Sequence, residues 1–169
     1  MASERVKAGL LEGPRQVLTF SLGSEIYGVD ILRVREIRGW SSVTRIPRVP
    51  PHVLGVLNLR GSIVPILDMR VRFGLPQPEF TPLTAVIVLS VGSPSDARHR
   101  EFGLVVDAVA DVIDIVAEQL KEAPKLGPAA EFIDGLAVAG ERMLILLKVE
   151  ELIQRDTEPR WFGEPPSVA

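Results

Sequence analysis

GVLNLRGSIVPILDMR, residues 55–70, consists of two apolar runs divided by a glycine. Each run has the length of one strand and is rich in aliphatic residues. Gly61 offers the positive φ that a tight hairpin turn requires. Pro65 has no N–H to donate, so it belongs on a strand edge or at a bulge. The stretch therefore predicts a β-hairpin, followed by a short helix in DMRVRF that Asp68 caps.

The same short-strand pattern continues over most of the chain. Further apolar runs lie between Gly, Pro and Ser clusters, among them VLTFSL, TAVIVLSV and MLILLKV. YGVDILRVREI resembles a helix in its spacing, but its Val, Ile and Gly content favours a strand. Helical periodicity is confined to DMRVRF, VEELIQ and PPHVLG. Many short strands separated by turn residues indicate an all-β sandwich or barrel.

Composition excludes several classes of function. The 169 residues, 46% of them hydrophobic, suffice for one domain or two very small ones. Nineteen Lys and Arg against 22 Asp and Glu give a net charge of -3, so no positive field exists to attract nucleic acid or anionic lipid. The chain has no cysteine, which excludes disulfides and thiolate chemistry. Because no apolar stretch approaches about 18 residues, we expect a cytoplasmic protein.

The sequence also contains an internal repeat. VLTFSLGSEIYGVDILRVREI resembles AVIVLSVGSPSDARHREFGLVVDAVADVI, which aligns Val34 with Val109. GVLNLRGSIVPILDMR resembles GLAVAGERMLILLKVE, which aligns Gly61 with Gly140 after one gap. Each repeat is roughly 65 to 70 residues long, and a unit of that length buries only about 60% of its unfolded surface. Two such units should therefore share a core. The repeat predicts barrels over residues 16–80 and 81–155, with tails over 1–15 and 156–169.

Arg60 stands out within the first hairpin. The repeat aligns it with Ala139, so the fold does not require a guanidinium at this position. A long cationic side chain on a hairpin tip is suited to reach a carboxylate or carbonyl of a partner. The alternative interpretation is a solvated turn residue.

Candidates for catalysis are few. His52 and His99 are the only histidines, whereas zinc sites use three or four ligands, and no GxGxxG, GxxxxGK[ST] or GxSxG motif occurs. Asp68 and Asp107 interrupt apolar runs, and a buried carboxylate can act as a general acid. Helix capping by Asp68 and a turn role for Asp107 explain them more simply. The sequence therefore predicts no catalytic, cofactor-binding or metal-binding residue, and favours an interaction surface.

Four stretches together resemble the CheW family of bacterial chemotaxis coupling proteins: FSLGSEIYGVDILRVREIRGW, VTRIPRVPPHVLGVLNLRGSIVPILDMRVRFG, VVDAVADV and GERMLILL. The resemblance covers about residues 16–155. It implies two five-stranded SH3-like barrels on a shared hydrophobic core, with no enzymatic activity and no cofactor. It also implies an adaptor that joins the regulatory domain of the histidine kinase CheA to the cytoplasmic hairpin of chemoreceptors. Such a protein would meet the membrane only through receptor arrays on its inner face.

The resemblance also assigns residues to two surfaces. The receptor-binding groove between the barrels would include Val34, Glu36, Arg60, Val109 and Val112. The kinase-binding edge of the first barrel would include Val43, Arg45 and Ile46. Each of the groove valines could equally belong to the core. The hairpin at residues 92–101 is longer than the family pattern and the C-terminal tail is rich in proline, which leaves contacts of the second barrel open.

Other hypotheses remain at this stage. An adaptor of a kinase pathway for pilus motility or another chemosensory output has the same sequence features, and the neighbouring genes would distinguish the two. A small-ligand-binding β-barrel or a hydrolase predicts an enclosed pocket with convergent polar groups. The adaptor instead predicts a shallow apolar groove between the barrels. A fragment of the kinase itself is disfavoured because the tails are too short for further domains.

Overall fold

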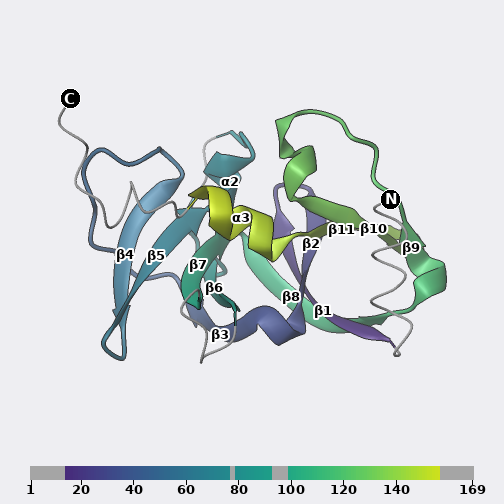
Figure 1. Cartoon of the computed structure of the whole chain (residues 1–169), viewed down its shortest axis with the longest axis horizontal. Helices are drawn as coiled ribbons and strands as arrows, with labels where there is room; N and C mark the ends of the chain where they lie inside the picture. The colour runs from purple at the N-terminus through teal and green to yellow at the C-terminus, as the bar shows by residue number, and fades with distance from the viewer. Residues whose placement is uncertain (1–13, 77–78, 93–98, 157–169) are drawn as a thin grey trace.

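The computed structural model describes residues 14–76, 79–92 and 99–156, which form two β-sheets side by side (Figure 1). The six-stranded sheet contains, in order, β8 (Ala108–Ile115), β1 (Arg15–Leu22), β2 (Glu25–Asp30), β11 (Arg142–Leu147), β10 (Ile133–Ala139) and β9 (Leu120–Lys121). The five-stranded sheet contains, in order, β3 (Val34–Gly39), β6 (Ala85–Val91), β7 (Arg100–Val106), β5 (Ser62–Asp68) and β4 (Val53–Leu59). The predicted all-β class is confirmed, with the two-residue β9 as an additional strand.

The helices are short. They are η1 (Ile31–Arg33), α2 (Met69–Arg72), η2 (Ala117–Gln119), η3 (Pro128–Phe132) and α3 (Val149–Asp156). The helices expected in DMRVRF and VEELIQ are confirmed, and Asp68 caps α2 by accepting the Arg70 N–H at 2.9 Å. The helix expected in PPHVLG is wrong, because β4 begins at Val53 and pairs with β5. α3, with eight residues, is the longest helix in the described ranges, which contain no helix with the length and apolar character of a membrane span.

The predicted division into barrels at residue 80 is wrong, because the two sheets interleave along the chain. β1 and β2 join the C-terminal strands β8 to β11, whereas β6 and β7 join β3, β4 and β5. After each N-terminal hairpin of a repeat, the third strand crosses to the other sheet, so β3 pairs with β6 and β8 pairs with β1. Sequence similarity between repeats carries no information on which copy a strand pairs with. The predicted tails lie mainly in residues 1–13 and 157–169, outside the described residues.

The duplication itself is confirmed by topology. The order β3-β6-β7-β5-β4 matches β8-β1-β2-β11-β10 strand for strand. Each sheet has one parallel pair at its centre, in which Gly28 lies opposite Leu146 and Gly103 lies opposite Ile66. Tyr27-Gly28 of the first repeat and Phe102-Gly103 of the second thus occupy equivalent places.

The core is shared between the sheets, as predicted. Its largest cluster combines Phe20 of β1 and Phe102 of β7 with Leu152 of α3, all fully buried. Each sheet also has one smaller hydrophobic cluster of its own. α3 crosses the junction of the two sheets (Figure 1). Because large apolar side chains from both sheets are buried together at the junction, we expect the two units to fold cooperatively as one domain.

A buried charge cluster stands where the chain passes from β7 to β8. Asp107 is the single residue between these strands, which belong to different sheets. Its Oδ2 accepts the Gly23 N–H at 2.7 Å and its Oδ1 accepts Arg70 Nη1 at 3.2 Å. Arg70 also donates to both oxygens of Asp68 at 3.0 Å, and Arg70 and Asp68 are each 1% exposed. The turn role expected for Asp107 is therefore combined with a link between sheets.

Protonation of Arg70 follows from these contacts. Burial lowers the pKa of Arg70, but hydrogen bonds and charges from Asp68 and Asp107 raise it by more, so the pKa lies above its ordinary value. Arg70 is thus a permanent cation whose buried charge is compensated by two carboxylates.

Tyr27 provides a pH-dependent test of the core. The ring lies between Phe20 and Phe73, with centroids 6.1 and 5.6 Å away. Burial, and to a lesser extent the Glu25 charge, raise its pKa above the ordinary 10.0. The folded state thus holds the phenolic proton more tightly, so this contribution to stability is complete below pH 10 and is lost as pH rises above it.

We expect the tyrosinate absorbance of the folded protein to rise at a pH above 10. The chain contains one tyrosine, so the signal is unambiguous. In urea the midpoint should return to about 10. Tyr27→Phe should reduce the loss of stability between pH 10 and 11, and a folded midpoint at or below 10 would contradict the assignment.

Candidate protein-binding site

One cluster of charges joins the edge strand β3 to the tip of the β4–β5 hairpin. Glu36 Oε1 lies 3.4 Å from Arg60 Nη2 and 3.9 Å from Arg38 Nη1. The Arg60 side chain is 82% exposed, and that of Glu36 is 27% exposed. Two residues named from the sequence, 24 positions apart, are thus brought into contact. The pair lies at the surface, where it is available to a partner.

The Arg60 backbone adopts the left-handed conformation. Arg60 has φ +53° and Gly61 has φ +88°, and Leu59 pairs with Ser62, which makes a two-residue hairpin loop with both φ values positive. Asn58 Oδ1 accepts the Gly61 N–H at 2.9 Å and supports the turn. For a residue with a Cβ this conformation costs about 1–2 kcal/mol. An arginine at a position that suits glycine indicates a role for its side chain.

The hairpin of the second repeat corrects the predicted equivalence of Arg60 and Ala139. In that hairpin Ala139 pairs with Arg142, so Gly140 takes the first loop position, with φ +65°. Gly140 is therefore the structural counterpart of Arg60, and Ala139 is that of Leu59. The single gap in the sequence alignment hid this shift, because the loop conformations of the two hairpins differ.

The three valines of the predicted groove have different environments. Val34 of β3 and Val109 of β8 are half-buried and pack against the shared core cluster. Val112 is 47% exposed. Glu36 and Arg60 are joined to each other. Within the described residues, neither of them forms a hydrogen bond or ion pair with β8. The alternative of core packing thus holds in part for Val34 and Val109, and Val112 is the valine most open to a partner.

A bulge separates Val109 from Val112. Phe20 of β1 lies opposite Val109 and Leu18 lies opposite Val112, so two residues of β8 face one residue of β1. The residue between them on β1 is Thr19, which is 1% exposed. Its hydroxyl lies 2.6 Å from Asp111 Oδ1 and accepts the Asp111 N–H at 3.1 Å. The buried Thr19 hydroxyl thereby stabilises the bulge, and the bulge determines the positions of Val109 and Val112 on β8.

The predicted kinase-binding residues lie on an outer segment, residues 40–49, that runs along β4. Thr44 exchanges two backbone hydrogen bonds with Val56, at 3.0 and 2.8 Å. Val43 is half-buried against the cluster inside the five-stranded sheet, Arg45 is exposed, and Ile46 is half-buried. The three are neighbours along the chain but differ in exposure, since only Arg45 is open to solvent. Thr44 already occupies part of the β4 edge.

Gly55 allows this segment to lie on β4. Its φ is +151°, and a Cβ there would stand 2.1 Å from the Thr44 carbonyl oxygen. Backbone atoms cannot yield as a flexible side chain can. The close approach of the outer segment thus depends on a residue without a side chain.

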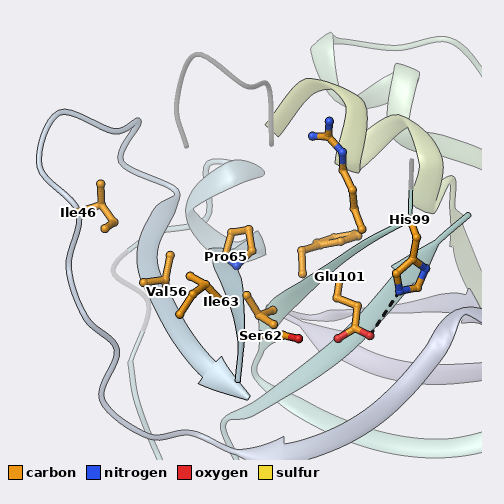
Figure 2. A pocket seen from close by; sticks show the side chains of 10 residues that line it. Ile46, Val56, Ser62, Ile63, Pro65, His99 and Glu101 are labelled. Carbon is orange, nitrogen blue, oxygen red and sulfur yellow. Dashed lines mark ion pairs between the residues drawn. The ribbon is translucent and has the colours of Figure 1, made fainter. Parts of the chain in front are cut away.

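A cleft of about 580 Å³ opens beside the outer segment (Figure 2). β5 and β7 pair only from Ile66 and Gly103 onward, and the earlier parts of the two strands leave the cleft between them. The hydrogen bonds of Val56 to Thr44 mean that the backbone nitrogen of its partner Pro65 points toward β7. Pro65 has no N–H there. β5 is not an edge strand, because it lies between β7 and β4. Pro65 is tolerated because the part of β5 before Ile66 is not paired with β7, so the missing N–H interrupts no ladder.

The walls of the cleft combine apolar side chains with a few polar and charged ones. Its sides include Ile46, Val56, Ile63, Pro65, His99 and Glu101. His99 Nε2 lies 3.6 Å from Glu101 Oε1, as drawn in Figure 2. Sequence reasoning missed Ile63, which is 64% exposed and follows the hairpin glycine by two residues. Within the described ranges no group of three or more His, Cys, Asp or Glu side chains is placed to hold a metal ion.

The chain is similar to known proteins in both sequence and fold. The CheW-like domain model matches residues 16–157. The chain is 46% identical over 144 residues to chemotaxis protein CheW of Klebsiella aerogenes, covering 84% of this chain and 83% of that protein. It is 35% identical over 145 residues to the probable chemotaxis protein CheW of Rhizobium etli, covering 85% and 90%. The crystal structure of the scaffolding protein TtCheW from Thermoanaerobacter tengcongensis is similar with a TM-score of 0.75 and 31% identity, covering 86% and 96%.

Proposed function

Because this chain belongs to the CheW-like family, we propose that it is the adaptor that couples chemoreceptors to the histidine kinase CheA in chemotaxis. The names of its relatives, chemotaxis protein and scaffolding protein, support the adaptor role. It has no catalytic step of its own and no cofactor, and its action is to hold two partners in one geometry. A coupling free energy of about 1–3 kcal/mol between the two binding events would suffice.

The receptor contacts consist of Val34, Glu36, Arg60, Val109 and Val112. The observation that carries this assignment is Arg60, which keeps a strained backbone and an exposed guanidinium beside Glu36. A helical hairpin offers an apolar stripe flanked by polar residues. The valines would receive the stripe, and the Glu36–Arg60 pair would set the register of the helix.

The kinase contacts consist of Val43, Arg45 and Ile46, on the outer segment. The partner is the regulatory domain of CheA, which is itself built of barrels of this kind. The adaptor works at receptor arrays on the inner face of the membrane, in the cytoplasm, and meets the membrane only through the receptors.

The decisive experiment reconstitutes kinase, receptor and ATP with and without this protein. We expect receptor ligands to change the rate of kinase autophosphorylation only when the adaptor is present. Receptor control that is the same without the protein would disprove the proposal.

Arg60→Gly separates function from stability. Glycine relieves the left-handed strain, while the exposed ion pair that is lost contributes little, so we expect stability to be unchanged or raised by up to about 1 kcal/mol. Receptor control of the kinase should nevertheless be lost. The measurements are urea unfolding and the reconstituted assay.

Arg142→Gly, at the base of the equivalent hairpin, is the matched control and should leave receptor control intact. A marked loss of stability in Arg60→Gly would make Arg60 a structural residue. Normal receptor control in this variant would exclude it from the receptor surface.

A further inference from the structure

Two residues other than glycine have positive φ in the described part of the chain, and both are arginines. Arg60 has φ +53° and Arg48 has φ +61°. Arg60 pairs with Glu36, whereas Arg48 is exposed and makes no hydrogen bond or ion pair with the described residues. The left-handed conformation costs about 1–2 kcal/mol for a residue with a Cβ. At Arg48 no hydrogen bond or ion pair of the side chain with the described residues offsets this cost.

The place of Arg48 is a turn at the end of the outer segment. Pro47 and Arg48 form a turn, and a second turn at Pro51 and His52 follows before β4. Proline followed by a residue of positive φ is typical of a type II turn, whose third position favours glycine or asparagine. Backbone bonds hold the chain on both sides, between Thr44 and Val56 and between Val53 N and Pro50 O, the latter at 2.9 Å. Arg48 therefore lies in a turn that backbone hydrogen bonds hold in place on both sides.

The stretch of chain that contains this turn carries charge of one sign. Residues 37–67 contain four arginines and no acidic residue, in a chain whose net charge is -3. Arg45 and Arg48 are both exposed, on either side of the half-buried Ile46. Arginine beside apolar groups is common at binding hot spots, and its planar fork pairs with carboxylates. This surface is complementary to an acidic patch on a partner.

We propose that Arg48 is a partner-binding residue whose guanidinium pairs with a carboxylate on the regulatory domain of the kinase, next to the contacts of Val43, Arg45 and Ile46. The proposal rests on the proposed function for the identity of the partner. It adds a residue that the family resemblance did not assign, and it explains why a strained turn position holds an exposed cation.

The test compares Arg48→Asn with Arg48→Lys. Asparagine tolerates the left-handed turn but has no charge, and lysine keeps the charge without the fork. Binding to the isolated kinase regulatory domain is measured by calorimetry at low and physiological salt. We expect Arg48→Asn to weaken binding about five- to tenfold and to reduce its salt dependence. Arg48→Lys should retain the salt dependence, and Arg142→Asn, an exposed arginine on the other sheet, should bind as wild type does.

Two further measurements complete the test. Receptor-fragment binding should be unaffected by Arg48→Asn and lost in Arg60→Gly. Arg48→Gly should unfold at the same or a higher urea concentration than wild type.

Three results would overturn the proposal. Wild-type affinity and salt dependence in Arg48→Asn would remove Arg48 from the interface while leaving the proposed function intact. Destabilisation by Arg48→Gly would show that the turn is not strained. Wild-type protein that does not bind the kinase domain at all would disprove the proposed function, and the partner assigned to Arg48 with it.

Discussion

Replacement of Arg70 by leucine is expected to lower the free energy of unfolding by about 3–5 kcal/mol. The guanidinium is 1% exposed and is the counter-ion of Asp68, which is equally buried. Without Arg70, a carboxylate would remain unpaired in the core, and Asp107 would lose its bond to α2. The expected fall in melting temperature is about 10 °C for a chain of this length.

Arg15→Leu is the matched control for Arg70→Leu. Arg15 also lies between two carboxylates, Asp30 and Asp134, each at 3.6 Å, but its side chain is 29% exposed. Solvent screens such pairs, so its loss should cost less than about 1 kcal/mol. The double variant Asp68→Leu with Arg70→Leu should recover part of the stability, because the fully buried carboxylate is removed together with its counter-ion and the remaining Asp107 is 35% exposed. Equal losses in Arg70→Leu and Arg15→Leu, measured by urea unfolding, would contradict the buried cluster.

Gly55→Ala is expected to cost about 3 kcal/mol and to displace the outer segment. A Cβ at Gly55 would stand 2.1 Å from the Thr44 carbonyl oxygen and 3.1 Å from Arg45 Cα. The φ of +151° is also unfavourable for alanine. To relieve the contact, Thr44 must leave Val56, which removes two backbone hydrogen bonds of about 1 kcal/mol each.

Hydrogen exchange provides the specific readout for Gly55→Ala. The amides of Thr44 and Val56 should lose protection, whereas those at the centre of β6 and β7 should not. Affinity for the kinase domain should also fall, because Val43, Arg45 and Ile46 lie on the displaced segment. Gly39→Ala is the control, because a Cβ at Gly39 would meet no atom within 4 Å and the φ of Gly39 is not positive, so its stability should stay within about 0.5 kcal/mol of wild type. Full protection of Thr44 in Gly55→Ala would refute the close-approach argument.

The two proposed surfaces are continuous along the chain. β3 carries Val34 and Glu36, and the outer segment with the kinase contacts follows directly. Trp40 stands at the junction, where its backbone N–H donates to the Thr84 carbonyl at 3.0 Å and its ring stacks on Phe80 at 4.4 Å. A rigid junction of this kind suits an adaptor, because a displacement imposed on one surface is passed to the other through packed backbone rather than through a flexible linker.

Local features of the sequence determined the strands, the hairpin at Gly61, the cap formed by Asp68 and the duplication. Each of these depends on a few neighbouring residues: alternation of apolar side chains, turn chemistry, or a side chain that reaches its own backbone. The hairpin pattern singled out Arg60 and the resemblance added Glu36, and the structure brings the two into contact. The roles of these residues stay predictions until receptor binding is measured.

Tertiary structure alone decided which sheet each strand joins and what the turn residues do there. The crossing of β3 and β8 between repeats, the link from Asp107 to Arg70, and the cleft between β5 and β7 all join residues from distant parts of the chain. The left-handed backbone of Arg48 and Arg60 also departs from what an arginine predicts. The physical reason is that strand pairing and burial are settled by the shared core as a whole, whereas a sequence pattern reports only the preferences of adjacent residues.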